Sequence, residues 1–176
     1  LFGIPLGISA AVRRNSFVDY FNRVFSLLGL SVPAFYLGIL LILVFSVKLR
    51  VFPVVSDGEF KNIEDNLMHM ALPALALGMM MTAYVTRMTR SSILDIMRED
   101  YVRTAHSKGL SDRKVLYKHV LRNALIPIVA LGGLYVVVLI GSSVMVEIVF
   151  SRPGLGKLLV GAIKQRDYTT LQSVMV

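Results

Sequence analysis

Cysteine is absent from the 176 residues, and this absence excludes disulfides, thiolate metal sites and catalysis by a thiol. A phosphate-binding loop for ATP hydrolysis is also missing, because that pattern requires glycine, four residues, then Gly-Lys-Ser/Thr. Gly156-Lys157 comes closest, but Ser151 and Leu158 occupy the other two required positions. The histidines show no metal-ligand spacing, and we expect His106 and His119 on solvated helix faces or at a partner interface.

Three long runs carry no charged residue at all. They cover residues 24–47, 66–86 and 123–146, and the mean hydropathy of the chain is +0.67. A helix of about 20 apolar residues crosses a hydrocarbon core of roughly 30 Å. The runs therefore predict an all-α, polytopic bundle of transmembrane helices. They also argue against an intramembrane enzyme, which needs convergent acids or histidines, because His69 is their only ionisable group apart from tyrosine.

The basic residues are distributed unevenly around these runs. The segments before residue 24 and at 87–122 hold 12 of the 19 Lys and Arg residues. Because basic residues in short loops mark the cytoplasmic side, we expect residues 87–122 inside and residues 48–65 and 147–167 outside. This topology accounts for the formal charge of +8 without a nucleic acid.

The two ends and the prolines suggest a larger bundle. Residues 1–12 and 168–176 are uncharged and resemble parts of spans, so we expect one domain over 1–176 within a natural protein that is longer at both ends. Pro33, Pro73 and Pro127 interrupt the runs, and each removes a backbone hydrogen bond that a neighbouring helix or water must replace. Glycines within the runs could allow close helix approach: Gly29, Gly38, Gly78, Gly132, Gly133 and Gly141.

The inner loop predicts two short amphipathic helices that meet at Gly109. Ser91 or Ser92 can cap the first, and apolar residues then recur at three- and four-residue steps. Gly109 suits the left-handed turn past a helix end, and Ser111 can cap the second helix. The first apolar face comprises Ile93, Ile96, Met97, Tyr101 and Ala105, and the second comprises Val115, Leu116, His119 and Val120.

The outer segment contains a turn at residues 152–156. Leu158, Leu159, Ala162 and Ile163 then predict a short helix, either across the outer mouth of a pore or as an interfacial linker. Glu147 lies at the outer end of a span, where we expect it to be hydrated rather than functional.

These residues resemble a known family. The spacing Ala105-x-x-x-Gly109 matches part of a Glu-Ala-Ala-x-x-x-Gly signature, with Arg103 in place of the acid and Arg122 where many relatives have proline. Residues 101–105, 119–125, 147–156 and 166–168 look similar as well. The chain therefore resembles the membrane subunit of binding-protein-dependent ATP-binding-cassette importers, of the oligopeptide, dipeptide, nickel and glutathione class and of the first-permease type.

The resemblance implies a type I importer permease fold in a bacterial or archaeal cytoplasmic membrane. It implies a second permease, two cytoplasmic ATPases that hydrolyse ATP and an extracytoplasmic substrate-binding protein as partners, besides membrane lipid and without nucleic acid. No catalytic residue, cofactor or metal is expected in this chain. The loop 87–122 would be the cytoplasmic coupling element, and its contact residues would be Arg103, Thr104, Ala105, Lys108, Gly109, Leu110, Ser111, Asp112 and Arg113.

The resemblance favours di- or oligopeptides as the substrate. Nickel complexes and glutathione stay open as alternatives, because no residue distinguishes them. A third interpretation, from another class, is a scaffold that transports nothing and whose basic loop binds anionic lipid or a partner.

Overall fold

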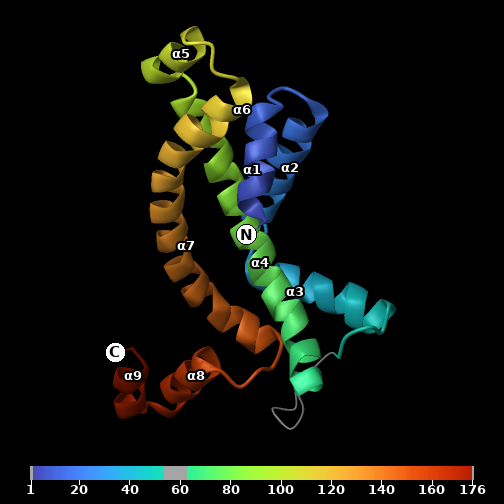
Figure 1. The fold of residues 1–176 in the computed structure, drawn as a ribbon. Helices are drawn as coiled ribbons and strands as arrows, with labels where there is room; N and C mark the ends of the chain where they lie inside the picture. Colours follow the sequence, from blue (N-terminus) through green and yellow to red (C-terminus); the bar gives the residue numbers. More distant parts are fainter. Residues whose placement is uncertain (1, 54–62, 176) are drawn as a thin grey trace. The chain divides into compact units, whose positions relative to one another are not determined.

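The computed structural model describes residues 2–53 and 63–175 and divides into two compact units. The first comprises Leu1–Ser31 and Met80–Val137, and the second comprises Val32–Met79 and Val138–Val176. All regular elements of the described residues are helical (Figure 1), as predicted. They are α1 (Gly3–Val12), α2 (Phe17–Ser31), α3 (Ala34–Leu41), the π-helical η1 (Ile42–Lys48), α4 (Ile63–Ile96), α5 (Asp100–Ser107), α6 (Asp112–Lys114), the π-helical η2 (Val115–Val120), α7 (Leu121–Val149), α8 (Leu155–Gln165) and α9 (Tyr168–Met175).

Two helices among the described residues are long and apolar enough to cross a membrane. They are Asp65–Ile96 and Asp112–Val149, and they contain the second and third uncharged runs. The first run is broken between α2 and α3, so it supplies a third span only if this pair is counted as one. Pro33 lies at the break with extended backbone, φ −60° and ψ 144°, as its early position in the run suggested. Pro73 and Pro127 are accommodated inside α4 and α7.

The inner loop differs from the prediction of two short helices. Ser91 and Ser92 cap no helix, because α4 continues past them to Ile96. The second predicted helix is the start of a continuous helix from Asp112 to Val149. Helix formation adds a hydrogen bond with each residue, so a single capping side chain does not interrupt a helix that packing supports. Only α5 is a short, separate helix.

One core cluster holds the first unit together. Its buried members come from α1, α4, α5, η2 and α7, and no side chain among them is more than 6% exposed. Burial of such side chains contributes roughly 1.5–3 kcal/mol for each large one. The core cluster consists of Ala11, Ile93, Val102, Ala105, Val115, Val120, Ala124 and Ile128.

Glycines bring α1 into contact with α4 in the same unit. A Cβ atom at Gly7 would lie 2.4 Å from Thr89 Cβ, and one at Gly3 would lie 2.7 Å from Val85 Cβ. Gly3 and Gly7 are four residues apart, which is the spacing of small residues at close helix contacts in membranes. Among the glycines predicted for this role, Gly38 lies close to Phe150 within the second unit, since a Cβ atom at Gly38 would lie 2.8 Å from Phe150 Cε2. Nothing lies within 4 Å of a Cβ at Gly78, Gly132, Gly133 or Gly141.

A buried ion pair joins α2 to α4. Asp19 is fully buried, and its two carboxylate oxygens accept hydrogen bonds from Arg90 Nε at 2.6 Å and Nη2 at 3.0 Å. The backbone N–H of Asn15 donates to the same carboxylate at 3.0 Å. This two-point geometry is the strong form of an Arg–carboxylate contact. The pair links segments 71 residues apart, and the sequence pattern gave no sign of it.

The turn before α8 in the second unit is organised by Glu147. Its Oε2 accepts the backbone N–H groups of Gly156 at 2.7 Å and Lys157 at 3.3 Å. A carboxylate at a helix N-terminus satisfies unpaired donors and complements the helix dipole. A Cβ atom at Gly154 would lie 2.5 Å from this carboxylate, so a larger residue there would displace the Glu147 side chain. Glu147 is thus a capping residue, which corrects the expectation of a merely hydrated acid.

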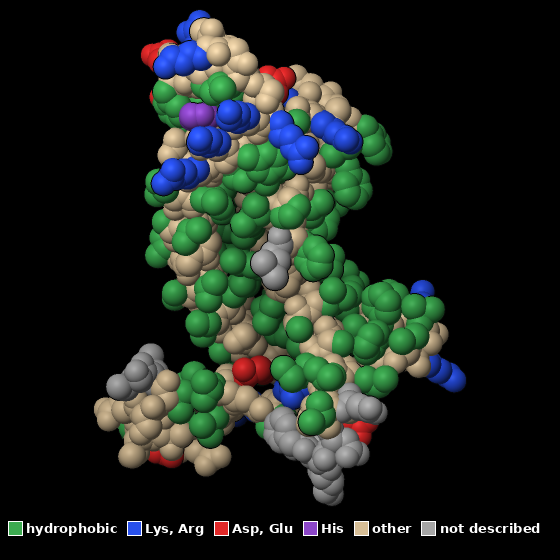
Figure 2. Space-filling model, in the orientation of Figure 1, with side chains coloured by type: hydrophobic (Ala, Val, Ile, Leu, Met, Phe, Trp, Pro, Cys, Tyr) green, Lys and Arg blue, Asp and Glu red, His purple; other side chains and the backbone are tan. Residues whose placement is uncertain are grey.

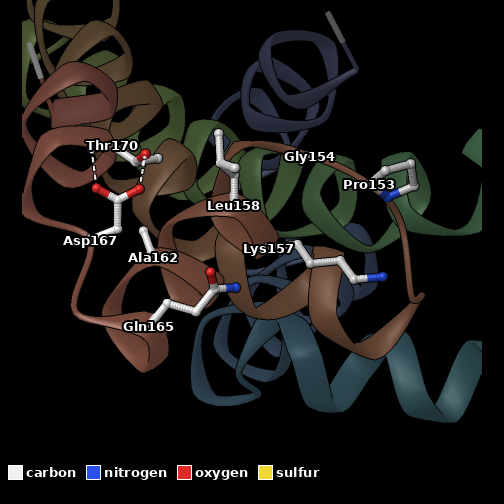
Figure 3. A pocket seen from close by; sticks show the side chains of 9 residues that line it. Pro153, Gly154, Lys157, Leu158, Ala162, Gln165, Asp167 and Thr170 are labelled. Atoms are coloured by element: carbon white, nitrogen blue, oxygen red, sulfur yellow. Dashed lines mark hydrogen bonds between the residues drawn. The ribbon is translucent and has the colours of Figure 1, made fainter.

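Asp167 makes a similar corner between α8 and α9. Its carboxylate accepts hydrogen bonds from the Thr170 hydroxyl and the Thr170 backbone N–H (Figure 3). It also accepts one from the backbone N–H of Thr169. The Thr170 hydroxyl, together with these N–H groups, lowers the pKa of Asp167. A shallow pocket of ≈ 440 Å³ lies between the two helices, and Lys157, Gln165 and Asp167 are among its lining residues.

Candidate functional site

Helix α5 is the one short helix between the two long apolar helices. The chain leaves α4 after Ile96 and becomes extended at Glu99, with φ −68° and ψ 145°. Asp100 then lies in the first turn of α5, where a negative charge is favourable. In Figure 1, α5 lies at one end of the first unit.

The end of α5 is fixed by a left-handed turn at Gly109. The φ of Gly109 is +75°, as the sequence predicted. The N–H of Gly109 donates to His106 O at 2.9 Å, and the N–H of Leu110 donates to Ala105 O at 3.4 Å. These two bonds form a Schellman motif, which satisfies the last carbonyl groups of the helix. The turn is therefore rigid, and its backbone geometry favours glycine.

One face of α5 is buried in the first unit. Val102 is 2% exposed and Ala105 is 6% exposed, and both belong to the core cluster. Leu110, just past the turn, packs against the same cluster. The Tyr101 hydroxyl also accepts a hydrogen bond from Asn123 Nδ2 of α7 at 2.8 Å. A displacement of α5 would therefore act directly on α7.

The opposite face of α5 and its turn is exposed. Of the nine predicted contact residues, Ala105 and Leu110 point inward and the other seven are exposed. The small side chain of Ala105 thus serves the packing of α5. The exposed seven are Arg103, Thr104, Lys108, Gly109, Ser111, Asp112 and Arg113.

Few internal contacts restrain the charges on this face. Arg103 Nη1 lies 3.8 Å from Asp100 Oδ1, and both side chains are largely exposed. His106 Nδ1 lies 3.5 Å from Asp112 Oδ1. Exposed pairs of this kind contribute roughly 0–1 kcal/mol, so their charges stay available to another molecule. Figure 2 shows lysine and arginine side chains gathered around α5, α6 and the adjoining end of the first unit.

A largely apolar pocket of ≈ 490 Å³ lies beside α5. Val102, Val115 and Leu116 contribute to its lining, and His106 and Arg113 also line it. An apolar pocket with a few polar groups is typical of sites that receive a side chain or a ligand. The sequence did not indicate this pocket, because it requires α5 to pack beside η2.

The described residues show no cluster of three His, Cys, Asp or Glu side chains suited to a metal ion. His106 is partly exposed and His119 is half-buried. The site therefore offers surface, charge and a pocket, and we find no arrangement of side chains for catalysis in it.

Long apolar helices on either side of a short helix, whose outer face and following turn are exposed and charged, define an integral membrane protein. The chain matches, over residues 3–176, the family described as "Binding-protein-dependent transport system inner membrane component", and it belongs to that family of importer permeases.

Two kinds of relative illustrate the match. The chain is 43% identical over 180 residues to "Oligopeptide transport system permease protein AppB" of Bacillus subtilis (strain 168), covering 100% of this chain and 57% of that protein. It is 46% identical over 173 residues to "Glutathione transport system permease protein GsiC" of Escherichia coli (strain K12), covering 98% of this chain and 54% of that protein. The chain thus spans about half the length of the curated relatives it matches.

Proposed function

We propose that this chain belongs to the permease subunit of an ATP-driven importer. With a second permease it forms a pathway for short peptides across the cytoplasmic membrane. Two ATPase subunits hydrolyse ATP on the cytoplasmic side, and a binding protein delivers substrate from outside. Family membership carries this proposal, and the exposed, rigidly capped helix α5 supports it as the element through which force is transmitted.

The coupling role follows from the two faces of α5. The exposed face, with Arg103, Lys108 and Arg113, offers positive charge to an acidic groove on an ATPase. The buried face, with Val102 and Ala105, passes movement of α5 to α7 through the core cluster. A force-transmitting element must be rigid, and the Schellman turn at Gly109 supplies that rigidity.

The coupling role can be tested at Gly109 in the full transporter. Gly109→Val places a β-branched side chain at φ +75°, which such residues resist. We expect the permease to insert, while the ATPase subunits dissociate or lose substrate-stimulated turnover. Gly161→Val is the matched control, because its φ is not in the left-handed region and nothing lies within 4 Å of a Cβ there. Normal uptake and normal ATPase association in Gly109→Val would refute the coupling role.

The orientation in the membrane can be tested with single introduced cysteines, because the 176 residues contain no cysteine. Lys164→Cys should react with a membrane-impermeant thiol reagent added to intact cells, and Ser107→Cys should not. Both positions are exposed in the structure, so a difference reports the side of the membrane. Labelling of Ser107→Cys from outside would reverse the proposed orientation.

Short peptides are the substrate class we propose. The relatives are named for oligopeptide and for glutathione, so glutathione stays the alternative, together with nickel complexes. Deletion of the full-length gene should abolish uptake of a labelled dipeptide or oligopeptide. Normal peptide uptake, with loss of glutathione or nickel uptake, would shift the assignment to that alternative. ATPase subunits that never co-purify with the permease would favour the scaffold instead.

A further inference from the structure

A pocket of ≈ 250 Å³ lies between α2 and α4 in the first unit. It is separate from the α5 surface, and the coupling role does not use it. Most of its lining residues are polar or basic, although the larger part of the surface that they present to the pocket is apolar. The relevant side chains are Asn22, Arg23 and Ser26 from α2, and Thr86, Arg87 and Arg90 from α4.

Three buried polar side chains in this pocket each have an oxygen atom without a hydrogen-bond partner among the described residues. Asn22 and Ser26 are each 3% exposed, and Thr86 is 1% exposed. Within the described part of the chain, no partner reaches Asn22 Oδ1, Ser26 Oγ or Thr86 Oγ1. A buried polar atom without a partner destabilises the fold, because it has lost its hydrogen bond to water and gained none in return. The pocket therefore favours a ligand that supplies acceptors for the hydroxyls and a donor for the Asn22 amide oxygen.

The pocket also carries an excess of positive charge. Asp19 is neutralised by the two hydrogen bonds from Arg90. Arg23 Nη2 lies 3.4 Å from that same carboxylate, and its Nε is buried without a hydrogen-bond partner within the described residues. Arg87 has no carboxylate within ion-pairing distance among the residues described. Arg23 and Arg90 thus share one carboxylate while Arg87 pairs with none among the described residues, and this surplus of positive charge favours an anion.

The apolar side chains around the pocket favour a lipid over a free ion as its ligand. Leu27, which lines the pocket, is 57% exposed, and Val24 and Leu28 on the same helix are 54% and 61% exposed. Such side chains suit contact with acyl chains. In the orientation proposed above, the pocket faces the inner leaflet, where basic pockets between helices bind lipid head groups.

We propose that this pocket binds the phosphate group of an inner-leaflet lipid. Guanidinium groups and hydroxyls would donate to the phosphate oxygens, and a head-group hydroxyl would donate to Asn22 Oδ1. Phosphatidylglycerol has both an anionic phosphate and hydroxyl donors, so it is the probe of choice. The inner-leaflet assignment rests on the proposed orientation, whereas binding itself does not depend on transport.

The test measures lipid binding to the full-length permease in its purified transporter complex. Native mass spectrometry during titration with phosphatidylglycerol or phosphatidylcholine gives the affinity for each. Wild type should prefer phosphatidylglycerol, and Arg87→Gln should weaken that binding on the order of tenfold, the effect of losing a charge-assisted hydrogen bond. Arg87→Lys should restore part of it. Arg122→Gln is the matched control, since it removes the same charge from an exposed position outside the pocket.

The double variant Ser26→Ala/Thr86→Ala tests the hydroxyls separately from charge, and it too should weaken phosphatidylglycerol binding. Equal affinity for the two lipids in wild type would overturn the proposal. So would equal losses in Arg87→Gln and Arg122→Gln, which would indicate a diffuse surface effect. Binding of inorganic phosphate with no lipid preference would overturn the lipid assignment. Because neither uptake nor ATPase activity is measured, the outcome is independent of the importer proposal.

Discussion

Each of the two units contains a carboxylate that is at least partly shielded from water, and the two carboxylates are stabilised by different kinds of partner. In the first unit, Asp19 is fully buried and is held by the guanidinium of Arg90. In the second unit, Glu147 is half-buried and accepts backbone N–H groups from the start of α8. The first solution needs a charged partner on another helix, whereas the second needs only a nearby helix end with room for the carboxylate.

This difference makes the two units unequal in their sensitivity to mutation. Removing one member of a buried ion pair leaves an uncompensated charge, whereas removing a capping carboxylate leaves N–H groups that water can reach. The following predictions test that contrast, beginning with the largest expected effect.

Loss of the Asp19 carboxylate should have the largest effect. Asp19→Ala leaves Arg90 without its carboxylate partner. Removing one member of a buried ion pair lowers the free energy of unfolding by roughly 3–5 kcal/mol. We expect a large fall in thermal stability of the full-length permease in detergent, measured with a double-mutant cycle that includes Arg90→Ala. Asp100→Ala is the control, because it breaks the exposed pair with Arg103 and should cost less than about 1 kcal/mol. Equal losses of thermal stability in Asp19→Ala and Asp100→Ala would show that the buried pair stabilises the protein no more than the exposed pair does.

Close contact between α1 and α4 predicts the next effect. In Gly7→Val, even the Cβ would lie 2.4 Å from Thr89 Cβ and 2.8 Å from the Thr86 carbonyl oxygen. Overpacking of this kind costs typically about 1–3 kcal/mol, and the thermal midpoint should fall. Gly132→Val is the control, since nothing lies within 4 Å of a Cβ there. Similar midpoints for the two variants would contradict the close contact.

Removal of the Glu147 cap should have a moderate and local effect. Glu147→Ala frees the N–H groups of Gly156 and Lys157, and the loss of a cap costs about 0.5–2 kcal/mol. Hydrogen exchange of these two amides should accelerate, while exchange in the core cluster stays unchanged. Glu147→Gln keeps an acceptor oxygen and should show a smaller acceleration. A global loss of stability in Glu147→Ala would mean that the two carboxylates do not differ as described.

Each unit also contains a short helix that ends in a left-handed turn, but the residue in the left-handed conformation differs between the two. The first unit has Gly109 at φ +75°, and the second has Arg166 at φ +55°. Because left-handed backbone costs a non-glycine residue roughly 1–2 kcal/mol, Gly109→Ala should destabilise α5 by about 1 kcal/mol. Arg166→Gly should instead slow hydrogen exchange at the end of α8. Matching changes of the same sign in both variants would contradict this reasoning.

The smallest effect concerns pH at the corner between α8 and α9. The pKa of Asp167 is lowered in the folded state, so its capping contribution is present above the unfolded pKa of about 3.9 and is lost as pH falls through the lower folded value. Amide exchange at Thr169 and Thr170, corrected for its intrinsic pH dependence, should therefore show weaker protection in strong acid. Asp167→Asn should remove this pH dependence. Unaltered pH dependence in Asp167→Asn would exclude the carboxylate as its source.

Local patterns predicted several parts of this structure. Uncharged runs of sufficient length indicated the helices α4 and α7, and Gly109 indicated the end of α5, because chain length and left-handed backbone are local properties. The helix α8 also followed from its apolar spacing. The prediction of a helix cap at Ser91 or Ser92 was wrong, because both residues lie within α4, whose continuation to Ile96 is supported by the burial of Ile93 in the core cluster. Ser111, the other predicted cap, does lie at the N-cap position of α6.

The sequence by itself determined the helical class, the long apolar helices, the concentration of basic residues at 87–122 and the family. Only the tertiary structure decided that Ala105 and Leu110 point inward while Arg103, Lys108 and Arg113 point outward. It also decided that Asp19 meets Arg90 across 71 residues. Which face of a helix is buried depends on the helices packed beside it, and an ion pair between distant segments depends on a packing geometry that no local pattern encodes.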